Sequence, residues 1–152
     1  MIRMALAAAL FFVGTAAAEA QVTVKDAWVR ATVPAQHATA AFMQLTAADP
    51  MRLVAAQSPV AGTVEIHEMA MVDGVMKMRA ISGLDLPAGK TVMLDPGGYH
   101  VMLLDLKGQI HVGDVVPITL VFEGRDKRRT TIDLKAPARA LAESSAGKMQ
   151  MK

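Results

Sequence analysis

Two histidines and two methionines stand at a spacing that could hold a soft metal ion. Ten residues separate His67 from Met78, twenty-one residues separate Met78 from His100, and Met102 follows two positions later. The 152-residue chain has four histidines and no cysteine, so imidazole nitrogens and thioether sulfurs are the soft donors that it offers. Thioethers favour Cu(I), and imidazole accepts the same ion. The four residues are therefore candidate ligands of a singly charged copper ion.

The first two candidates fall within a predicted β-hairpin. Asp73-Gly74 lies between two apolar, partly alternating runs, and this dipeptide favours a two-residue turn. In that register His67 faces Ala80 and Met69 faces Met78. His67 and Met78 then become diagonal neighbours on one face, roughly 7 to 8 Å apart by backbone, which is within reach of long side chains converging on one ion.

The other two candidates belong to a second predicted strand. One residue separates His100 from Met102, so both side chains point to the same face of that strand. Gly97-Gly98 comes directly before them and places His100 near the strand end, where one face can open to solvent. Such a position suits a site that exchanges its metal.

The rest of the chain predicts short strands separated by turns that contain Pro, Gly and Asp. Strands at this spacing indicate one all-β domain, built as an antiparallel β-sandwich. Residues 136–146 have a helical composition, but Pro137 interrupts it, so we expect a flexible tail over 137–152. The expected strands cover residues 22–24, 27–29, 40–45, 53–56, 64–71, 75–81, 91–94, 100–106, 115–122 and 129–134.

The first twenty residues predict a secretory signal peptide. A positively charged start precedes an apolar run over 5–18 that is too short to span a bilayer, and Ala18-Glu19-Ala20 offers a cleavage site. No cysteine follows the run, so we expect no lipid attachment there. We therefore expect an exported domain over residues 21–136, in the periplasm, with no membrane span in the mature chain.

Charge and aromatic content argue against a nucleic-acid partner. Sixteen Lys and Arg against fourteen Asp and Glu give a net charge of +2, and the chain has four Phe, one Tyr and one Trp. The single basic cluster is Lys127-Arg128-Arg129. With no aromatic platform beside it, we interpret the cluster as the solvated start of a strand.

Several residues allow a plain structural interpretation instead. A histidine on a strand is often only hydrogen-bonded, and a methionine is often an adaptable core filler, so the residues by themselves leave the metal site open. Glu65 and Glu68 could support the histidines. The remaining candidates receive lesser roles: Met69, Met71 and Met76 as an apolar rim, His37 and His111 as surface loop residues, and Met149 and Met151 as a frayed end that could hold a second copper.

Longer segments resemble one known family. The stretch 64–79, Leu86-Pro87-Ala88-Gly89 and the stretch 96–103 resemble the periplasmic CuA chaperone family (PCuAC), whose motif is His, ten residues, Met, twenty-one residues, His-x-Met. The resemblance also includes Ala27-Trp28-Val29-Arg30 and the late strands. It implies a cupredoxin-like β-sandwich that binds one Cu(I) and passes copper towards the CuA centre of cytochrome c oxidase. By position, the implied ligands are His67, Met78, His100 and Met102.

The resemblance implies a copper chaperone and no enzyme. Its partners would be the copper ion and either the oxidase subunit that carries CuA or a thioredoxin-like copper carrier, and we expect a monomer. Neutral imidazole is needed for ligation, so copper affinity would fall as the pH drops through about 6.5.

Three alternatives remain: an interaction module with a Met-rich apolar face, a protein that buffers periplasmic copper for tolerance, and a copper-dependent redox enzyme. The last would need an open coordination position.

Overall fold

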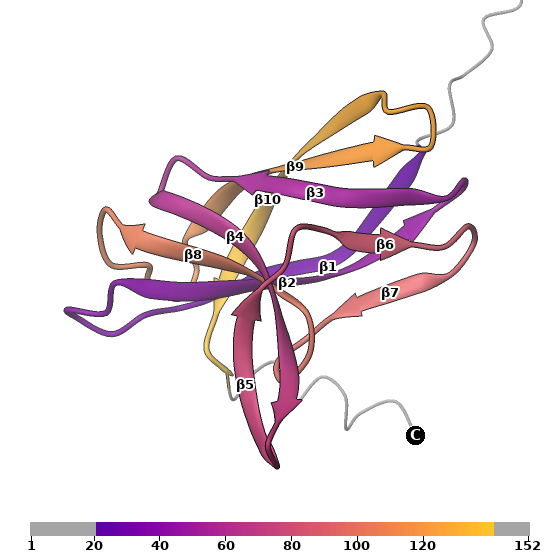
Figure 1. Ribbon diagram of the computed structural model, residues 1–152. Coiled ribbons are helices and arrows are strands. Elements are labelled where there is room, and N and C mark those ends of the chain that lie inside the picture. The colour runs from indigo at the N-terminus through magenta and orange to yellow at the C-terminus, as the bar shows by residue number, and fades with distance from the viewer. Residues whose placement is uncertain (1–20, 142–152) are drawn as a thin grey trace, which may run out of the picture.

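The computed structural model describes residues 21–141, and ten β-strands make up most of this range (Figure 1). The predicted all-β fold is confirmed. One strand, β6, was not predicted, because its three residues Leu-Asp-Leu are too short to give a sequence pattern. The strands are β1 (Val22–Arg30), β2 (Ala38–Ala47), β3 (Met51–Gln57), β4 (Ala61–Val72), β5 (Val75–Ala80), β6 (Leu84–Leu86), β7 (Thr91–Leu94), β8 (His100–Leu106), β9 (Val115–Gly124) and β10 (Arg129–Arg139).

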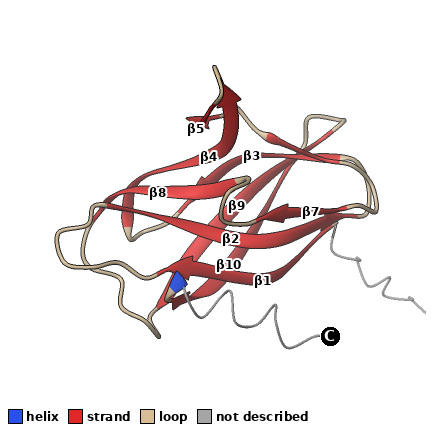
Figure 2. Ribbon diagram, turned by 90° about the horizontal axis from the view of Figure 1, so that it is seen from below, coloured by secondary structure: helices blue, strands red, loops and turns tan. Residues whose placement is uncertain are grey.

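The strands form one hydrogen-bonded path that folds over into two layers (Figures 1 and 2). Its order is β5-β4-β8-β2-β1-β10-β9-β3-β6, and β7 pairs with β2 beyond the end of β8. The first layer runs from β5 to β1, and the second from β10 to β6. A parallel pairing of Val29 with Ala138 joins the layers, whereas every other strand pairing is antiparallel. The predicted antiparallel sandwich thus contains one parallel seam.

Alternating apolar residues from both layers fill the space between them. On β9 each second residue points inward, from Val116 to Phe122, and all four of these side chains are buried. On β8 the inward residues are Val101 and Leu103, neither of which is exposed. The side chains between them, such as Met102, therefore point to the outer face of the first layer.

A β-bulge changes which residues of β1 face the core. Val22 and Val24 lie opposite inward residues of β2, and the register shifts between Lys25 and Trp28. Asp26, at the shift, has a φ of 51°. After the bulge Val29 points into the core, so that Trp28 is placed on the outer face.

The β4–β5 hairpin projects from the body of the sandwich (Figure 1). Asp73 and Gly74 both have positive φ, 51° and 78°, as a two-residue type I′ turn requires. The observed register pairs His67 with Ala80 and Met69 with Met78, as predicted. Every residue of β5 is exposed, so this strand packs on no other layer.

Strand β10 ends later than the sequence predicted. Pro137 pairs with Val115, and Ala138 is buried with 2% of its surface exposed, so residues 137–139 belong to the sheet and not to the expected tail. Pro137 is tolerated because its restricted φ still allows an extended conformation. The cost is the loss of one backbone hydrogen-bond donor. The expected signal peptide and the rest of the expected tail, with Met149 and Met151, lie outside the described residues.

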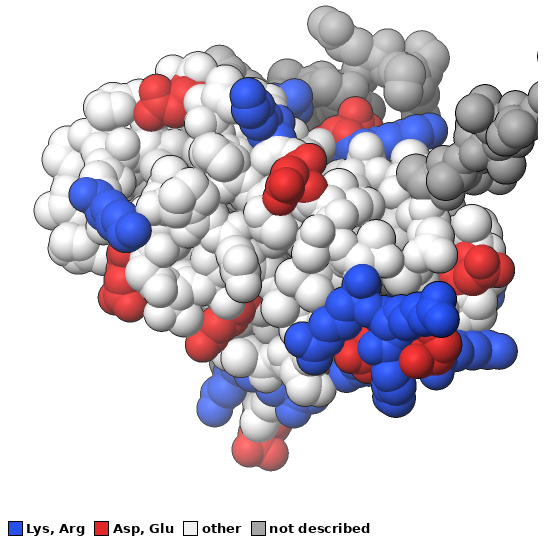
Figure 3. Space-filling view, turned by 90° about the horizontal axis from the view of Figure 1, so that it is seen from above, with Lys and Arg blue, Asp and Glu red and all other residues white. Residues whose placement is uncertain are grey.

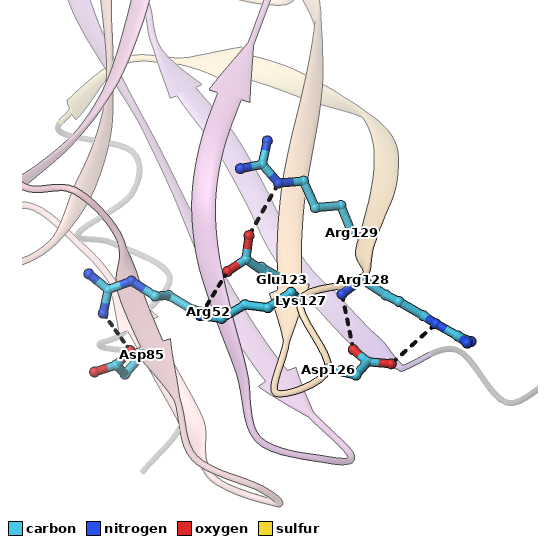
Figure 4. Close-up of polar contacts among 7 residues, drawn as sticks. All are labelled: Arg52, Asp85, Glu123, Asp126, Lys127, Arg128 and Arg129. Atoms are coloured by element: carbon cyan, nitrogen blue, oxygen red, sulfur yellow. Dashed lines mark hydrogen bonds and ion pairs between the residues drawn. The ribbon is translucent and has the colours of Figure 1, made fainter.

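Charged side chains of both signs lie together on one side of the molecule (Figure 3). Within the predicted basic cluster, Lys127 and Arg129 contact the carboxylate of Glu123 at 3.6 and 3.2 Å, and Arg128 contacts Asp126 at 3.5 Å (Figure 4). Carboxylates therefore offset much of this positive charge. In residues 21–141 there is no helix of the length and apolar character needed to cross a membrane.

Candidate metal centre

The two candidate histidines face each other across neighbouring strands. His67 on β4 pairs directly with His100 on β8, and their ring centroids are 5.6 Å apart. Both side chains lie on the outer face of the first layer, because their neighbours Ile66 and Val101 point into the core. Both histidines are nevertheless buried, with exposed fractions of 9% and 5%.

Hydrogen bonding selects the tautomer of His100. Its Nδ1–H donates to the carbonyl oxygen of Gly98 at 3.0 Å, which leaves the Nε2 lone pair free in the neutral ring. This Nε2 lies 3.0 Å from the thioether sulfur of Met78. A nitrogen donor from β8 and a sulfur donor from β5 thus meet above β4.

A carboxylate selects the tautomer of His67. Its Nε2–H donates to Glu65 Oε2 at 2.7 Å, so the free lone pair is on Nδ1. This Nδ1 is buried and has no hydrogen-bond partner among the described residues. Buried polar atoms are almost always hydrogen-bonded, and an unpaired acceptor costs about 1 to 3 kcal/mol. An electron-pair acceptor such as a metal ion would satisfy it.

The two methionines border a cavity beside the histidines. The cavity has a volume of about 240 Å³, and Met78, His100 and Met102 are among its lining residues. Met78 is 48% exposed, whereas Met102 is only partly exposed. The structure therefore brings all four predicted residues into one region, with His67 on the β4 side of His100. Among residues 21–141 no three His, Cys, Asp or Glu side chains form a group that could hold a metal.

Burial lowers the pKa of His100 below its ordinary value of 6.5. Loss of hydration disfavours the charged ring and is the largest effect; the nearby His67 adds to it, and the hydrogen bond to Gly98 opposes it. At neutral pH the ring of His100 is therefore uncharged, which is the form that binds metals.

The turn before β8 favours glycine at position 97. Gly97 has a φ of 93°, a left-handed conformation that residues with a side chain rarely adopt. A Cβ added to Gly98 would lie 2.9 Å from Asp95 Oδ1, so the side chain of Asp95 would have to move. Because the Gly98 carbonyl accepts from His100, the turn directly orients the ring.

Aromatic rings continue the row of His100 across the sheet. Phe42 lies 6.3 Å from the His100 ring and 4.7 Å from the Trp28 ring, and both are almost fully buried. Neither residue was predicted to support the site. The sequence pattern did not reveal the position of Trp28, because this residue reaches the outer face only through the bulge of β1.

Of the other predicted candidates, Glu65 alone contacts one of the two histidines in the part of the chain that the structure describes. His37 and His111 are exposed loop residues, as expected, and the ring of His111 lies 3.5 Å from Asp114. Met71 and Met76 are exposed at the far end of the hairpin, with fractions of 64% and 48%. Glu65 contacts His67, whereas Glu68 forms an ion pair of 2.6 Å with Arg79 and does not support a histidine. Met69 is paired with Met78.

Fold and site together define a class of protein, a small cupredoxin-like β-sandwich with two histidines and two methionines on the outer face of one sheet. The sequence matches the family model described as "Putative lipoprotein LpqE-like" over residues 22–137. The chain belongs to this family, which is the PCuAC family that its motif resembles.

Relatives and solved structures agree with this membership. The chain is 32% identical over 115 residues to "Putative lipoprotein Lxx21020" of Leifsonia xyli subsp. xyli, covering 75% of this chain and 69% of the relative. It is 35% identical to the solution structure of CuI-DR1885 from Deinococcus radiodurans, with a TM-score of 0.62 and coverage of 82% and 83%. The copper-bound PCuAC domain from PmoF2 is 25% identical, with a TM-score of 0.59 and coverage of 79% and 95%.

Proposed function

We propose that this protein is a periplasmic copper chaperone that binds one Cu(I) and delivers it towards the CuA centre of cytochrome c oxidase. Family membership supports this function, as do the two similar structures whose descriptions name bound copper. The ligands in this proposal are His67, Met78, His100 and Met102. It assigns no catalytic residue.

The observation that carries the proposal is the buried Nδ1 of His67, which has no hydrogen-bond partner among the described residues, in a ring whose centroid lies 5.6 Å from that of His100. Each ring has its other nitrogen fixed by an oxygen acceptor, Glu65 for His67 and Gly98 for His100. Histidine ligands of metals commonly show this arrangement, because the acceptor fixes the ring and raises its basicity. A structural histidine would have a partner on both buried nitrogens.

The donor set suits Cu(I) and its release. Two neutral imidazoles and two neutral thioethers are soft or borderline donors and leave the charge of the ion uncompensated, which favours Cu(I) over Cu(II). A thiolate would bind copper more tightly, but the chain has no cysteine. Met78 is half exposed, so an incoming ligand could replace its sulfur first.

Anaerobic titration of the protein with Cu(I) against a competing chelator tests this assignment. We expect a stoichiometry of one that is lost in His100→Ala and in Met102→Leu. His37→Ala and His111→Ala serve as matched controls, because these histidines lie in exposed loops, and they should bind copper like the wild type. Absence of measurable binding by the wild type would refute the function.

Delivery is tested separately from binding. Cu(I)-loaded protein is mixed with a copper-free domain that carries the CuA ligands. Because a centre built from Cu(I) alone is colourless, samples are oxidised by one electron with ferricyanide at set times, and the absorption of the oxidised centre is measured. A chaperone forms the centre faster than an equal amount of chelator-bound copper, whereas a buffering protein slows it. The expected signal peptide over residues 1–20 is checked by the mass of the exported protein.

A further inference from the structure

A second row of outward side chains crosses the sheet next to the row of the histidines. Met102 on β8 pairs with Glu65 on β4 and with Ala40 on β2. Because Val29 pairs with Ala41, the next residue of β1, Arg30, comes opposite Ala40. The row ends on β10, where Arg139 pairs with Arg30.

The cavity at the metal centre lies over the middle of this row. Arg30 and Ala40 line it together with Met78, His100 and Met102. Ala40 has the smallest side chain of the row, so it leaves space between the long side chains of Arg30 and Met102. Arg30 and three of the four proposed copper ligands thus border one cavity of about 240 Å³.

The positive charge at the end of the row is not balanced. Arg30 and Arg139 are exposed and take part in no ion pair within residues 21–141, although like charges directly opposite each other are unfavourable. The carboxylate of Glu65, at the other end, is held by His67. Arginines elsewhere, such as Arg79 and Arg129, do contact carboxylates. Two adjacent unpaired cations, of which Arg30 lines the cavity, indicate a place for an anion.

We propose that this cavity receives the anionic sulfur of a copper-accepting protein, and that Arg30, with Arg139 behind it, positions that thiolate next to the copper. The inference rests on the proposed function. A thiolate is the anion that best suits the site. It is soft enough to take Cu(I) from thioethers, and its negative charge would balance the positive charge of the unpaired arginines. Arg30 is a positioning residue and no copper ligand.

The transfer step is a ligand exchange without redox change. The thiol first loses its proton to solvent, and its sulfur then donates an electron pair to Cu(I). The bond from copper to Met78 or Met102 breaks as the new bond to the thiolate forms, and the copper remains Cu(I). The guanidinium lowers the barrier by holding the negative sulfur within the cavity before the exchange.

The test compares two acceptor peptides that differ in charge. One contains a Cys-x-x-Cys segment, and the other has methionine in place of both cysteines. Transfer from the Cu(I)-loaded protein is timed by stopped flow with each peptide in excess. Arg30→Gln should slow transfer to the cysteine peptide about tenfold and leave transfer to the methionine peptide unchanged, whereas Arg30→Lys should retain most of the rate.

Controls separate charge at the cavity from charge elsewhere and from copper affinity. Arg125→Gln removes another arginine without an ion pair among the described residues, remote from this cavity, and should transfer at the wild-type rate. The equilibrium Cu(I) affinity of Arg30→Gln should equal that of the wild type. Without copper, the labelled cysteine peptide should bind more weakly to Arg30→Gln by fluorescence anisotropy.

The outcomes distinguish this inference from the proposed function. If the wild type binds no Cu(I), the function falls and the inference with it. If copper binds and Arg30→Gln supplies the cysteine peptide at the wild-type rate, the inference alone is overturned. Should Arg30→Gln not fold, rising salt must still slow wild-type transfer to the cysteine peptide more than to the methionine peptide, and equal slowing would overturn the inference.

Discussion

At His67 and His100 the nitrogen that could bind copper is set by the group on the other side of the ring. The acceptor for His67 is a carboxylate, and the acceptor for His100 is a backbone carbonyl. Both rings are buried, and the free lone pair of His67 has no hydrogen-bond partner among the described residues. The cost of leaving His67 Nδ1 unpaired in the copper-free protein becomes a gain in affinity when copper binds.

Replacing Glu65 tests this dependence at His67. Glu65→Gln keeps the size of the side chain but removes the negative charge that holds Nε2–H, and we expect Cu(I) affinity to fall about tenfold. Chelator competition measures the change. Glu68→Gln is the control, because Glu68 lies on the same strand but contacts Arg79. Equal affinities in Glu65→Gln and the wild type would show that the carboxylate is irrelevant.

The lowered pKa of His100 predicts how the copper-free protein responds to acid. The unfolded chain takes up this proton near the ordinary value of 6.5, and the folded protein takes it up only at lower pH. Between the two values the unfolded state binds more protons, so stability falls as the pH drops through this window. NMR titration of the ring should give a midpoint below 6.5.

The same effect should be visible in stability measurements. Urea unfolding at pH 7.5 and at pH 5 gives the loss of stability for the wild type, and His100→Gln should lose less over the same interval. A ring midpoint at or above the ordinary value, or an unchanged loss in His100→Gln, would contradict the assignment. The ring of His100 should bind copper to lower pH than an imidazole of ordinary pKa would.

At the scale of elements, the β4–β5 hairpin contributes one ligand by geometry alone. Its strands alternate faces, so Met78 lies on the side of His67 while Lys77 points away. The hairpin packs on no other layer, and its position depends on β4, which continues into the sandwich. A ligand on such an element can move away without disturbing the core.

Exchanging the residues at positions 77 and 78 tests this geometry. Lys77→Met combined with Met78→Lys keeps the composition but moves the thioether to the opposite face. We expect Cu(I) affinity to fall by at least about tenfold, which is the smallest loss seen when groups that only support a ligand are removed. The double variant Met71→Leu and Met76→Leu should bind copper like the wild type, because these side chains lie beyond the site. Wild-type affinity in the exchanged variant would exclude Met78 as a ligand.

Elements governed by local signals were predictable, and those governed by distant pairing were not. Asp73-Gly74 determined the hairpin register, which the structure confirms, because the turn type depends on these two residues. The bulge in β1 depends on β2, far along the chain, and no local pattern marks it. It hid the roles of Trp28 and Arg30, since simple alternation from Val22 would have turned both inward.

At the scale of the whole molecule, the site lies on the outer face of a sheet whose inner face is the core. Val101 and Ile66 anchor the strands of His100 and His67 between the two layers. The donors from β4 and β8 are therefore held by a rigid scaffold, while the Met78 side is open. A carrier needs this combination, because affinity comes from preorganised donors and release comes from an accessible one.

Closure of the sandwich depends on three residues that the sequence assigned to a tail. Ala138 donates to Asp114 and accepts from Gly113, at 2.7 and 3.0 Å, and the Arg139 carbonyl accepts from Ala31 at 2.9 Å. The helical composition after residue 136 concealed this role, because the pairing partners lie in β1 and in the loop before β9. The bond from Ala31 to Arg139 joins the second layer to the residue that directly follows β1, the strand that carries Trp28 and Arg30. The two bonds of Ala138 hold the end of β10 to the loop before β9.

Shortening the chain measures the contribution of that seam. A chain that ends at residue 136 should be at least about 3 kcal/mol less stable in urea unfolding than one that ends at residue 141. It loses these three backbone hydrogen bonds, worth about 1 kcal/mol each, and also the ladder pairing of Ala138 and Arg139 with β1. Both variants carry a new carboxylate, so the comparison isolates residues 137–141. Equal stability would mean that the β1–β10 pairing contributes nothing. A lower stability accompanied by slower copper transfer would connect the seam to the position of Arg30.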